Sequence, residues 1–265
     1  ANHKVTFILD QVPENTPEDA GIFITGDFCH WYPDMKKNRM SKIGDLYYIL
    51  TLELPARDIE YKYTRGSWET SECHTDGTGM PNRKLHAGQK EDVRDAVYAW
   101  EDKLHSSSKQ VEILGDFVYQ YRNNPAKKIW VYKPPDYDES DIEYPLLIML
   151  PGQNLFDNFY AEVREWGIDK KLNNLSLQGI TCPVIAGIEI EKDFIPLKDS
   201  RLIRMQKNSK AGHLAHFIVD QLIPYMSSHY RISHSPHDTG IIGSEWLSKF
   251  VFYTGLQHPE VFSKI

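Results

Sequence analysis

Side chains of the kind that contact sugars occur in the turns of the first part of the chain. They are two tryptophans, an ammonium group, a carboxylate and an amide: Trp31, Lys62, Trp68, Glu69 and Asn82. A flat ring can stack on the C–H face of a pyranose while such polar groups hydrogen-bond its hydroxyls. The alternative is that both rings pack the rim of a β-sandwich and bind nothing.

The order of these residues is informative. A tryptophan after the Gly26-Asp27-Phe28 strand end is followed by Glu-Tyr-Lys-Tyr at 60–63, a Trp-Glu pair and an Asn-Arg pair. Over about residues 5–100 this order resembles the starch-binding module of glucoamylases and related enzymes. The resemblance implies that Trp31 and Trp68 are stacking platforms and that Lys62, Glu69 and Asn82 hydrogen-bond the same sugar. The loop at 70–80 is longer than in that family, and the segment 62–68 is shorter, which could reshape the groove.

A second motif, Gly243-Ser244-Glu245-Trp246-Leu247, joins an expected strand to an expected helix. Buried apolar runs at 145–150 and 184–190 and the sequence His-Pro-Glu-Val-Phe at 258–262 accompany it. From about residue 127 to 265 these features resemble the esterase group of α/β-hydrolases that contains esterase D and the enterochelin esterases. The resemblance implies an α/β-hydrolase-type parallel sheet, with Gly152 and Gln153 as a remnant of the oxyanion loop.

The chemistry of that group depends on a Gly-x-Ser-x-Gly turn, which presents a serine oxygen. In this register Glu245 stands at the nucleophile position and Leu247 at that of the second glycine. A histidine base cannot activate a carboxylate as it activates a hydroxyl, and Ser244 lies one position from the apex. Twenty residues follow Glu245, with His258 the one histidine among them. We therefore expect no Ser-His-Asp catalysis and assign no catalytic residue.

The composition is that of a soluble globular protein. The 265 residues carry a formal net charge of −7, and 41% of them are hydrophobic and 25% charged. There is no basic run and no apolar stretch of about 20 residues, so neither nucleic acid nor membrane is expected as a partner. We expect no cofactor and no metal, since the late histidines lack acidic or cysteine partners at ligand spacing: His213, His216, His229, His234 and His237.

The cysteines and the first residues leave the compartment open. Cys182 lies in an apolar run and is expected as a buried thiol, whereas Cys29 and Cys73 could pair only if the fold brings their loops together. The first residues contain no apolar signal-peptide core. Localisation is unassigned, and a secreted, periplasmic or cell-surface protein whose signal has been removed is the leading interpretation.

The periodicity of the chain changes at about residue 105. Short β-rich runs separated by turns predict an immunoglobulin-like antiparallel β-sandwich over residues 1–104. A polar, serine-containing linker follows at 105–109. From 110 to 265 strands alternate with helices, which predicts a parallel sheet covered on both faces.

Two functions are compatible with these patterns. The first is a carbohydrate-recognising protein, with an α-glucan as its partner, built on an esterase-like scaffold without triad catalysis. The alternative is a carboxylic-ester hydrolase for a carbohydrate-linked or siderophore-like ester, seen as an incomplete chain. Because the sequence ends one helix after the strand at 239–242, we expect the later strands of such a sheet to be absent from it and the edge of that strand to be open. We therefore expect either that copies associate through this edge as a homo-oligomer or that more protein follows residue 265 in the native form.

Overall fold

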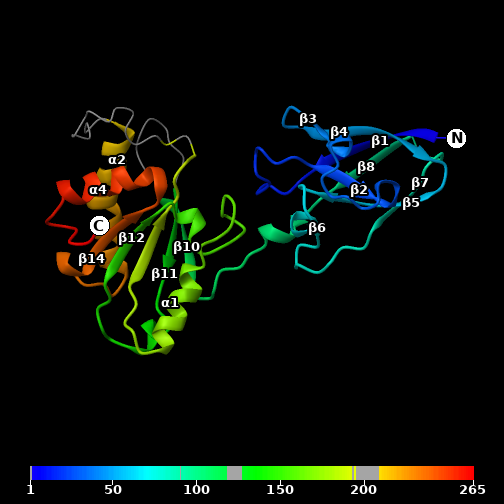
Figure 1. The fold of residues 1–265 in the computed structure, drawn as a ribbon. Coiled ribbons are helices and arrows are strands. Elements are labelled where there is room, and N and C mark those ends of the chain that lie inside the picture. Colours follow the sequence, from blue (N-terminus) through cyan, green and yellow to red (C-terminus); the bar gives the residue numbers. More distant parts are fainter. Residues whose placement is uncertain (1, 90, 118–126, 193, 195–208) are drawn as a thin grey trace. The chain divides into compact units, whose positions relative to one another are not determined.

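The computed structural model describes residues 2–89, 91–117, 127–192, 194 and 209–265. The chain divides into two compact units, coloured by sequence in Figure 1. The first comprises Ala1–Ser106 with Asn158–Glu162, and the second comprises Ser107–Asp157 with Val163–Ile265. The periodicity of the sequence gave no sign that five residues so late in the chain belong to the first unit. The predicted domain and linker boundaries stay predictions.

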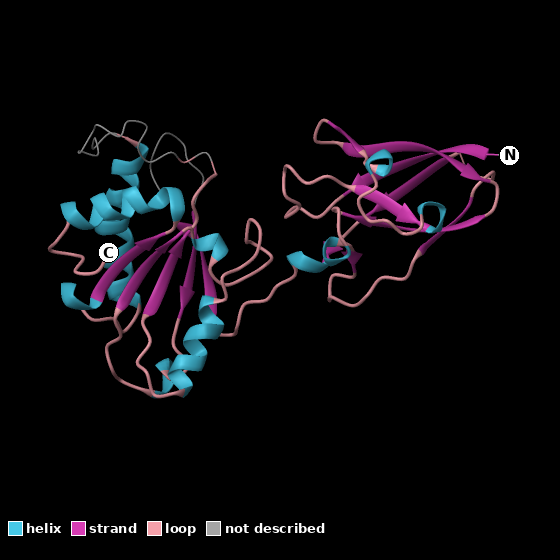
Figure 2. Cartoon of the chain, viewed as in Figure 1, coloured by secondary structure: helices cyan, strands magenta, loops and turns pink. Residues whose placement is uncertain are grey.

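Three sheets of short strands form the first unit (Figure 2). Their strand orders are β3-β4-β1-β8, β2-β5-β7 and β6-β9. The strands are β1 (Asn2–Gln11), β2 (Phe23–Gly26), β3 (Ser41–Ile43), β4 (Tyr47–Pro55), β5 (Asp58–Thr64), β6 (Glu72–Cys73), β7 (Arg83–His86), β8 (Asp92–Ala96) and β9 (Ala99–Trp100).

The two larger sheets share one hydrophobic core. On β5, Tyr61 and Tyr63 are buried, whereas Glu60 and Lys62 are partly exposed, as the period of two in a strand requires. The rings of Phe7 on β1 and Tyr61 meet edge to face, with centroids 5.2 Å apart. One face of β5 therefore builds the core and the other is available to solvent.

The antiparallel sheets expected in the first half are confirmed, with one correction. Strand β8 runs parallel to β1, and Phe7 lies opposite Val93. The other strand pairs of the described first unit are antiparallel. Parallel neighbours need a long return connection, and the chain between β1 and β8 provides one.

A single five-stranded sheet with helices on both faces forms the second unit, in the order β10-β11-β13-β12-β14. On one face the hydroxyl of Tyr132 donates to Oδ1 of Asn173 in α1 at 2.9 Å. The opposite face packs against α2, α3 and α4 around one core (Figure 1). The elements are β10 (Val111–Phe117), β11 (Lys127–Tyr132), β12 (Leu146–Leu150), α1 (Ile168–Leu177), β13 (Val184–Ile188), α2 (Lys210–Phe217), α3 (Ile223–His229), β14 (Thr239–Gly243) and α4 (Ser248–Gln257).

This sheet is mixed, which corrects the expectation of a parallel one. Strands β13, β12 and β14 run parallel, but β11 is antiparallel to both of its neighbours. The connection from β10 to β11, residues 118–126, is shorter than the dozen or so residues that a parallel crossover requires. Strand β10 is not among the strands expected from the sequence.

The expected open edge at β14 is partly covered. Ser263 N donates to Thr239 O at 3.2 Å, and Ile241 N donates to Lys264 O at 3.0 Å. These bonds pair residues 263–264 with the outer side of the strand, so the expectation of a wholly unpaired edge is wrong. Association of copies through this edge stays a prediction.

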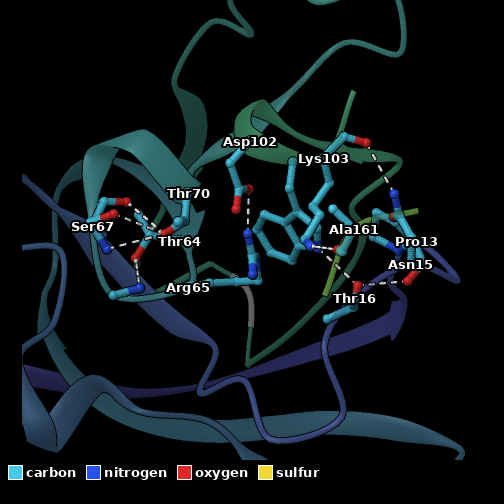
Figure 3. Close-up of polar contacts among 12 residues, drawn as sticks. Pro13, Asn15, Thr16, Thr64, Arg65, Ser67, Thr70, Asp102, Lys103 and Ala161 are labelled. Atoms are coloured by element: carbon cyan, nitrogen blue, oxygen red, sulfur yellow. Dashed lines mark hydrogen bonds and ion pairs between the residues drawn. The ribbon is translucent and has the colours of Figure 1, made fainter. Parts of the chain in front are cut away.

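Lys103 fastens the late segment 158–162 inside the first unit (Figure 3). Its side chain is buried, and Nζ donates to the carbonyl oxygen of Ala161 and, at 3.1 Å, to that of the next residue. The amide of Asn15 adds donors to the carbonyl oxygens of Lys103, at 3.0 Å, and Phe159, at 3.1 Å. The segment is therefore held through its backbone, by the buried side chain of Lys103 and the half-buried side chain of Asn15.

We expect Lys103→Met to lower the free energy of unfolding of the first unit by about 1–3 kcal/mol, because two carbonyl groups lose a charged donor. Urea titration followed by tryptophan fluorescence measures this. Lys37→Met, which removes an exposed lysine from the same unit, is the control and should be nearly neutral. Equal unfolding midpoints for the two variants would contradict the role of Lys103.

Candidate functional site

The fold of the first unit brings Trp31 and Trp68 together. Their ring centroids are 6.3 Å apart, and their planes are inclined by 44°. Trp68 keeps 44% of its surface exposed, and Trp31 is half-buried. The rings meet at an angle, and both retain accessible surface.

Trp31 is held in a strained turn. Strand β2 ends at Gly26, where a Cβ atom would lie 2.4 Å from the carbonyl oxygen of Glu60, so a side chain does not fit. The short helix η1 (Asp27–Cys29) follows, and Trp31 N donates to Gly26 O at 3.0 Å. His30 and Trp31 both have left-handed φ angles, of 55° and 59°. Such conformations cost about 1–3 kcal/mol each and gather at ligand sites.

Lys62 and Asn82 belong to the outward side of the β2-β5-β7 sheet. The register of β5 with β7 ends at the pair Tyr61 and Arg83, and Asn82 is the residue directly before β7. Both residues are half-buried. Asn82 hydrogen-bonds Glu60, and Lys62 lies two residues from Glu60 on the same face of β5, which the core does not use.

Glu69 belongs to the short helix η3 (Trp68–Thr70), which positions Trp68. Ser67 N donates to Thr70 Oγ1 at 3.2 Å, and the two hydroxyls lie 3.1 Å apart, which closes this turn (Figure 3). Glu69 is exposed. Within the described residues, no contact joins its carboxylate to the other four predicted site residues.

Arg83, the residue after Asn82, is the centre of a buried charge network that sequence reasoning missed. Its guanidinium donates to Glu72 at 2.7 Å and to Asp95 at 3.0 Å, and Glu72 is fully buried. Oδ2 of Asp95 also accepts the hydroxyls of Tyr61, at 2.9 Å, and Tyr63, at 2.8 Å. The network joins β5, β6, β7 and β8 and so fixes the start of β7, where Asn82 stands.

The ionisation of the network follows its geometry. Burial, followed by the charge of Asp95, raises the pKa of Tyr61 and of Tyr63, so both stay neutral donors. Burial by itself lowers the pKa of Arg83, but Glu72 and Asp95 more than offset this and raise it. The network thus keeps a charged arginine and neutral tyrosines.

In the second unit, Glu245 occupies the apex of the strand-to-helix turn. Its φ is 46°, in the left-handed region, and it is separated from β14 by Ser244 and begins the short helix η9 (Glu245–Leu247) that leads into α4. Gly243 is needed because a Cβ atom there would lie 2.5 Å from the side chain of Val251. Leu247, at the position of the motif's second glycine, is fully buried in the core. Glu245 itself is exposed.

The loop after β12 is tied to the end of β13. Nε2 of Gln153 donates to Ile190 O at 2.6 Å, and Ile190 N donates to Oε1 of Gln153 at 3.1 Å. A Cβ atom on Gly152 would lie 2.4 Å from the carbonyl carbon of Gly187, so the two backbones are in close contact. The Gln153 side chain therefore fastens the loop.

Three further sequence interpretations bear on function. Cys29, Cys73 and Cys182 are buried free thiols, so the Cys29–Cys73 disulfide that the sequence left open is not formed. Within the described ranges, no group of three or more His, Cys, Asp and Glu side chains could hold a metal ion. None of the helices in the described part of the chain is long and apolar enough for a membrane crossing.

Part of the chain is homologous to part of two much longer enzymes. It is 38% identical over 101 residues to an α-amylase of Niallia circulans, covering 37% of this chain and 8% of that protein. It is also 38% identical over 134 residues to an amylopullulanase of Thermoanaerobacter thermohydrosulfuricus, covering 50% of this chain and 8% of that protein. The chain thus spans less than a tenth of the length of these curated relatives. No family model matches it.

Solved structures that align with this chain include esterases. The ferric enterobactin esterase of Salmonella typhimurium is 14% identical, with a TM-score of 0.44, and the match covers 98% of this chain and 70% of that one. A ferulic acid esterase of Anaeromyces mucronatus is 18% identical, with a TM-score of 0.41, and the match covers 62% of each chain. Both TM-scores are below 0.5, so the strand order of the second unit alone defines its architecture.

We expect Arg83→Met to lower the free energy of unfolding of the first unit by about 3–5 kcal/mol, because the fully buried Glu72 and the partly buried Asp95 would be left without their counter-charge. Arg94→Met is the matched control, since Arg94 forms an exposed ion pair with Asp10 at 2.8 Å and should contribute at most about 1 kcal/mol. Chemical denaturation of both variants measures the difference. A loss no larger for Arg83→Met than for the control would show that the network does not stabilise the fold.

Proposed function

We propose that the first unit binds an α-glucan, with Trp31 and Trp68 stacked against its sugar rings. The observation that carries this proposal is the contact between the exposed Trp68 and the half-buried Trp31, which is one of two consecutive left-handed residues in its turn. A strained backbone persists only where the surrounding structure compensates for it, and a ligand-binding turn is a common reason for keeping it. The homology to an α-amylase and an amylopullulanase supports an α-glucan as the sugar polymer.

The polar groups around the rings fit the same ligand. Lys62 offers ammonium donors, and Asn82 offers an amide directly before the neighbouring strand β7. Glu69 is exposed beside Trp68 and can turn towards a bound sugar without leaving a buried position. Sugar hydroxyls both donate and accept, so a site with both kinds of partner suits them.

For the second unit we propose an esterase-like scaffold that does not perform Ser-His-Asp catalysis. The left-handed φ of Glu245 supports the register in which a carboxylate replaces the nucleophilic serine. Nucleophilic attack by that carboxylate on an ester would produce an anhydride instead of a stable ester intermediate. This argues against the alternative, a carboxylic-ester hydrolase for a carbohydrate-linked or siderophore-like ester.

Calorimetric titration with soluble starch or a cyclic maltooligosaccharide should show weak, saturable binding. Trp31→Ala and Trp68→Ala should each weaken it by about 1–3 kcal/mol, because each removes a stacked aromatic contact. Trp246→Ala removes an exposed tryptophan of the second unit and is the control, with unchanged affinity expected. No heat with any glucan at high concentration of the wild-type protein would refute sugar binding.

Hydrolysis of p-nitrophenyl acetate should be no faster than an ordinary protein surface supports. Glu245→Ser should not create an esterase, because a serine nucleophile needs its histidine and acid partners as a unit. Initial rates over a range of substrate concentrations test both statements. A saturable rate that Ser244→Ala abolishes would instead identify Ser244 as the nucleophile.

A further inference from the structure

Glu60 contacts the candidate sugar site through Asn82. Nδ2 of Asn82 donates to Oε2 of Glu60 at 2.9 Å. The other oxygen, Oε1, lies 3.3 Å from Nζ of Lys84, which the register places directly opposite Glu60 on β7. The carboxylate is thus held between a cross-strand lysine and the amide of Asn82.

This contact decides which way the amide of Asn82 points. A carboxylate only accepts hydrogen bonds, so the NH₂ group of Asn82, and not its oxygen, must face Glu60. The carbonyl oxygen Oδ1 is then directed away from Glu60. Among the described residues, Oδ1 has no hydrogen-bond partner, so it is available to accept a bond from a ligand.

The charges around Glu60 keep it ionised. The hydrogen bond from Asn82, followed by that from Lys84, lowers the pKa of the Glu60 carboxyl group. Lys62 lies two residues along the same face of β5. A carboxylate therefore faces the amide at neutral and mildly acidic pH.

We propose that Glu60 is a positioning residue that fixes the amide of Asn82, so that the site presents a carbonyl acceptor beside the ammonium donor of Lys62. Without Glu60 the amide of Asn82 can rotate by half a turn. Its NH₂ group, a donor, then takes the place of the acceptor Oδ1. A sugar hydroxyl that donates to Oδ1 would then lose its acceptor for part of the time. This inference rests on the proposed function of the first unit.

The test compares Glu60→Ala with Glu60→Gln in the full chain. Glu60→Ala removes the acceptor of Nδ2 and should weaken binding of a cyclic maltooligosaccharide by about three- to tenfold, the range of one ordinary net hydrogen bond, here that from a sugar hydroxyl to Oδ1 of Asn82. Glu60→Gln keeps an oxygen that can accept from Nδ2, so it should retain affinity within about twofold. Asp58→Ala removes a carboxylate from the same face of β5, one that pairs with His86 at 2.6 Å, and should change nothing.

The side-chain amide signal of Asn82 in a ¹⁵N–¹H correlation spectrum, identified by its loss in Asn82→Asp, gives a second readout. It should shift in Glu60→Ala and stay unchanged in Asp58→Ala. A wild-type protein that binds no glucan would overturn the proposed function. Wild-type binding that Glu60→Ala leaves unchanged, an equal loss in Glu60→Gln, or an Asn82 signal insensitive to Glu60→Ala would overturn only the role of Glu60.

Discussion

The guanidinium of Arg83 is a charged group that is largely shielded from water. Several strands of the first unit supply the groups that neutralise or hydrogen-bond this network. Glu72 comes from β6, Asp95 from β8 and the two tyrosine hydroxyls from β5. A buried ion pair contributes little net stability when complete, but removing one partner is costly. The network therefore acts mainly as a constraint on register, since a slip of one residue in any of these strands would separate the partners.

The same constraint reaches the opposite face of β5. Tyr61 points into the network, so Glu60 and Lys62 must point outward. Arg83 is anchored within the sandwich, so Asn82, one position earlier, lies at the edge where its amide meets Glu60. The polar half of the candidate site is thus a consequence of the buried half of the same strands, whereas the two tryptophans depend on turns outside them.

Much of this arrangement could be predicted from the sequence, because its signals are local. The period of two in β4 and β5, the apolar runs of β12 and β13 and the helical spacing of α1 require only neighbouring residues. The glycine before the turn at Glu245 marked that turn for the same reason. The prediction of Trp31 and Trp68 as site residues depends on their order in a family pattern. The contact between their rings could not be deduced from their spacing in the sequence.

What could not be predicted depends on partners distant in the chain. The parallel pairing of β8 with β1 and the antiparallel pairing of β11 in the second unit are choices between neighbours that hydrophobic periodicity does not encode. The two acceptors of Arg83 could not be predicted either, since nothing in the sequence around Glu72 or Asp95 distinguishes them from solvated surface carboxylates. Glu60 could have been suspected, because the alternation in β5 sets it on the same face as Lys62.

The insertion of residues 158–162 into the first unit has a consequence for how such a protein can evolve. Domain shuffling moves contiguous stretches of a gene, and a cut after Ser106 would transfer the sandwich without the backbone carbonyls that Lys103 and Asn15 bind. The recipient would inherit a buried lysine with lost acceptors. Exchange of this module between proteins would therefore favour two kinds of variant. In one, another segment supplies the carbonyl groups of 158–162, and in the other, a smaller apolar residue replaces Lys103.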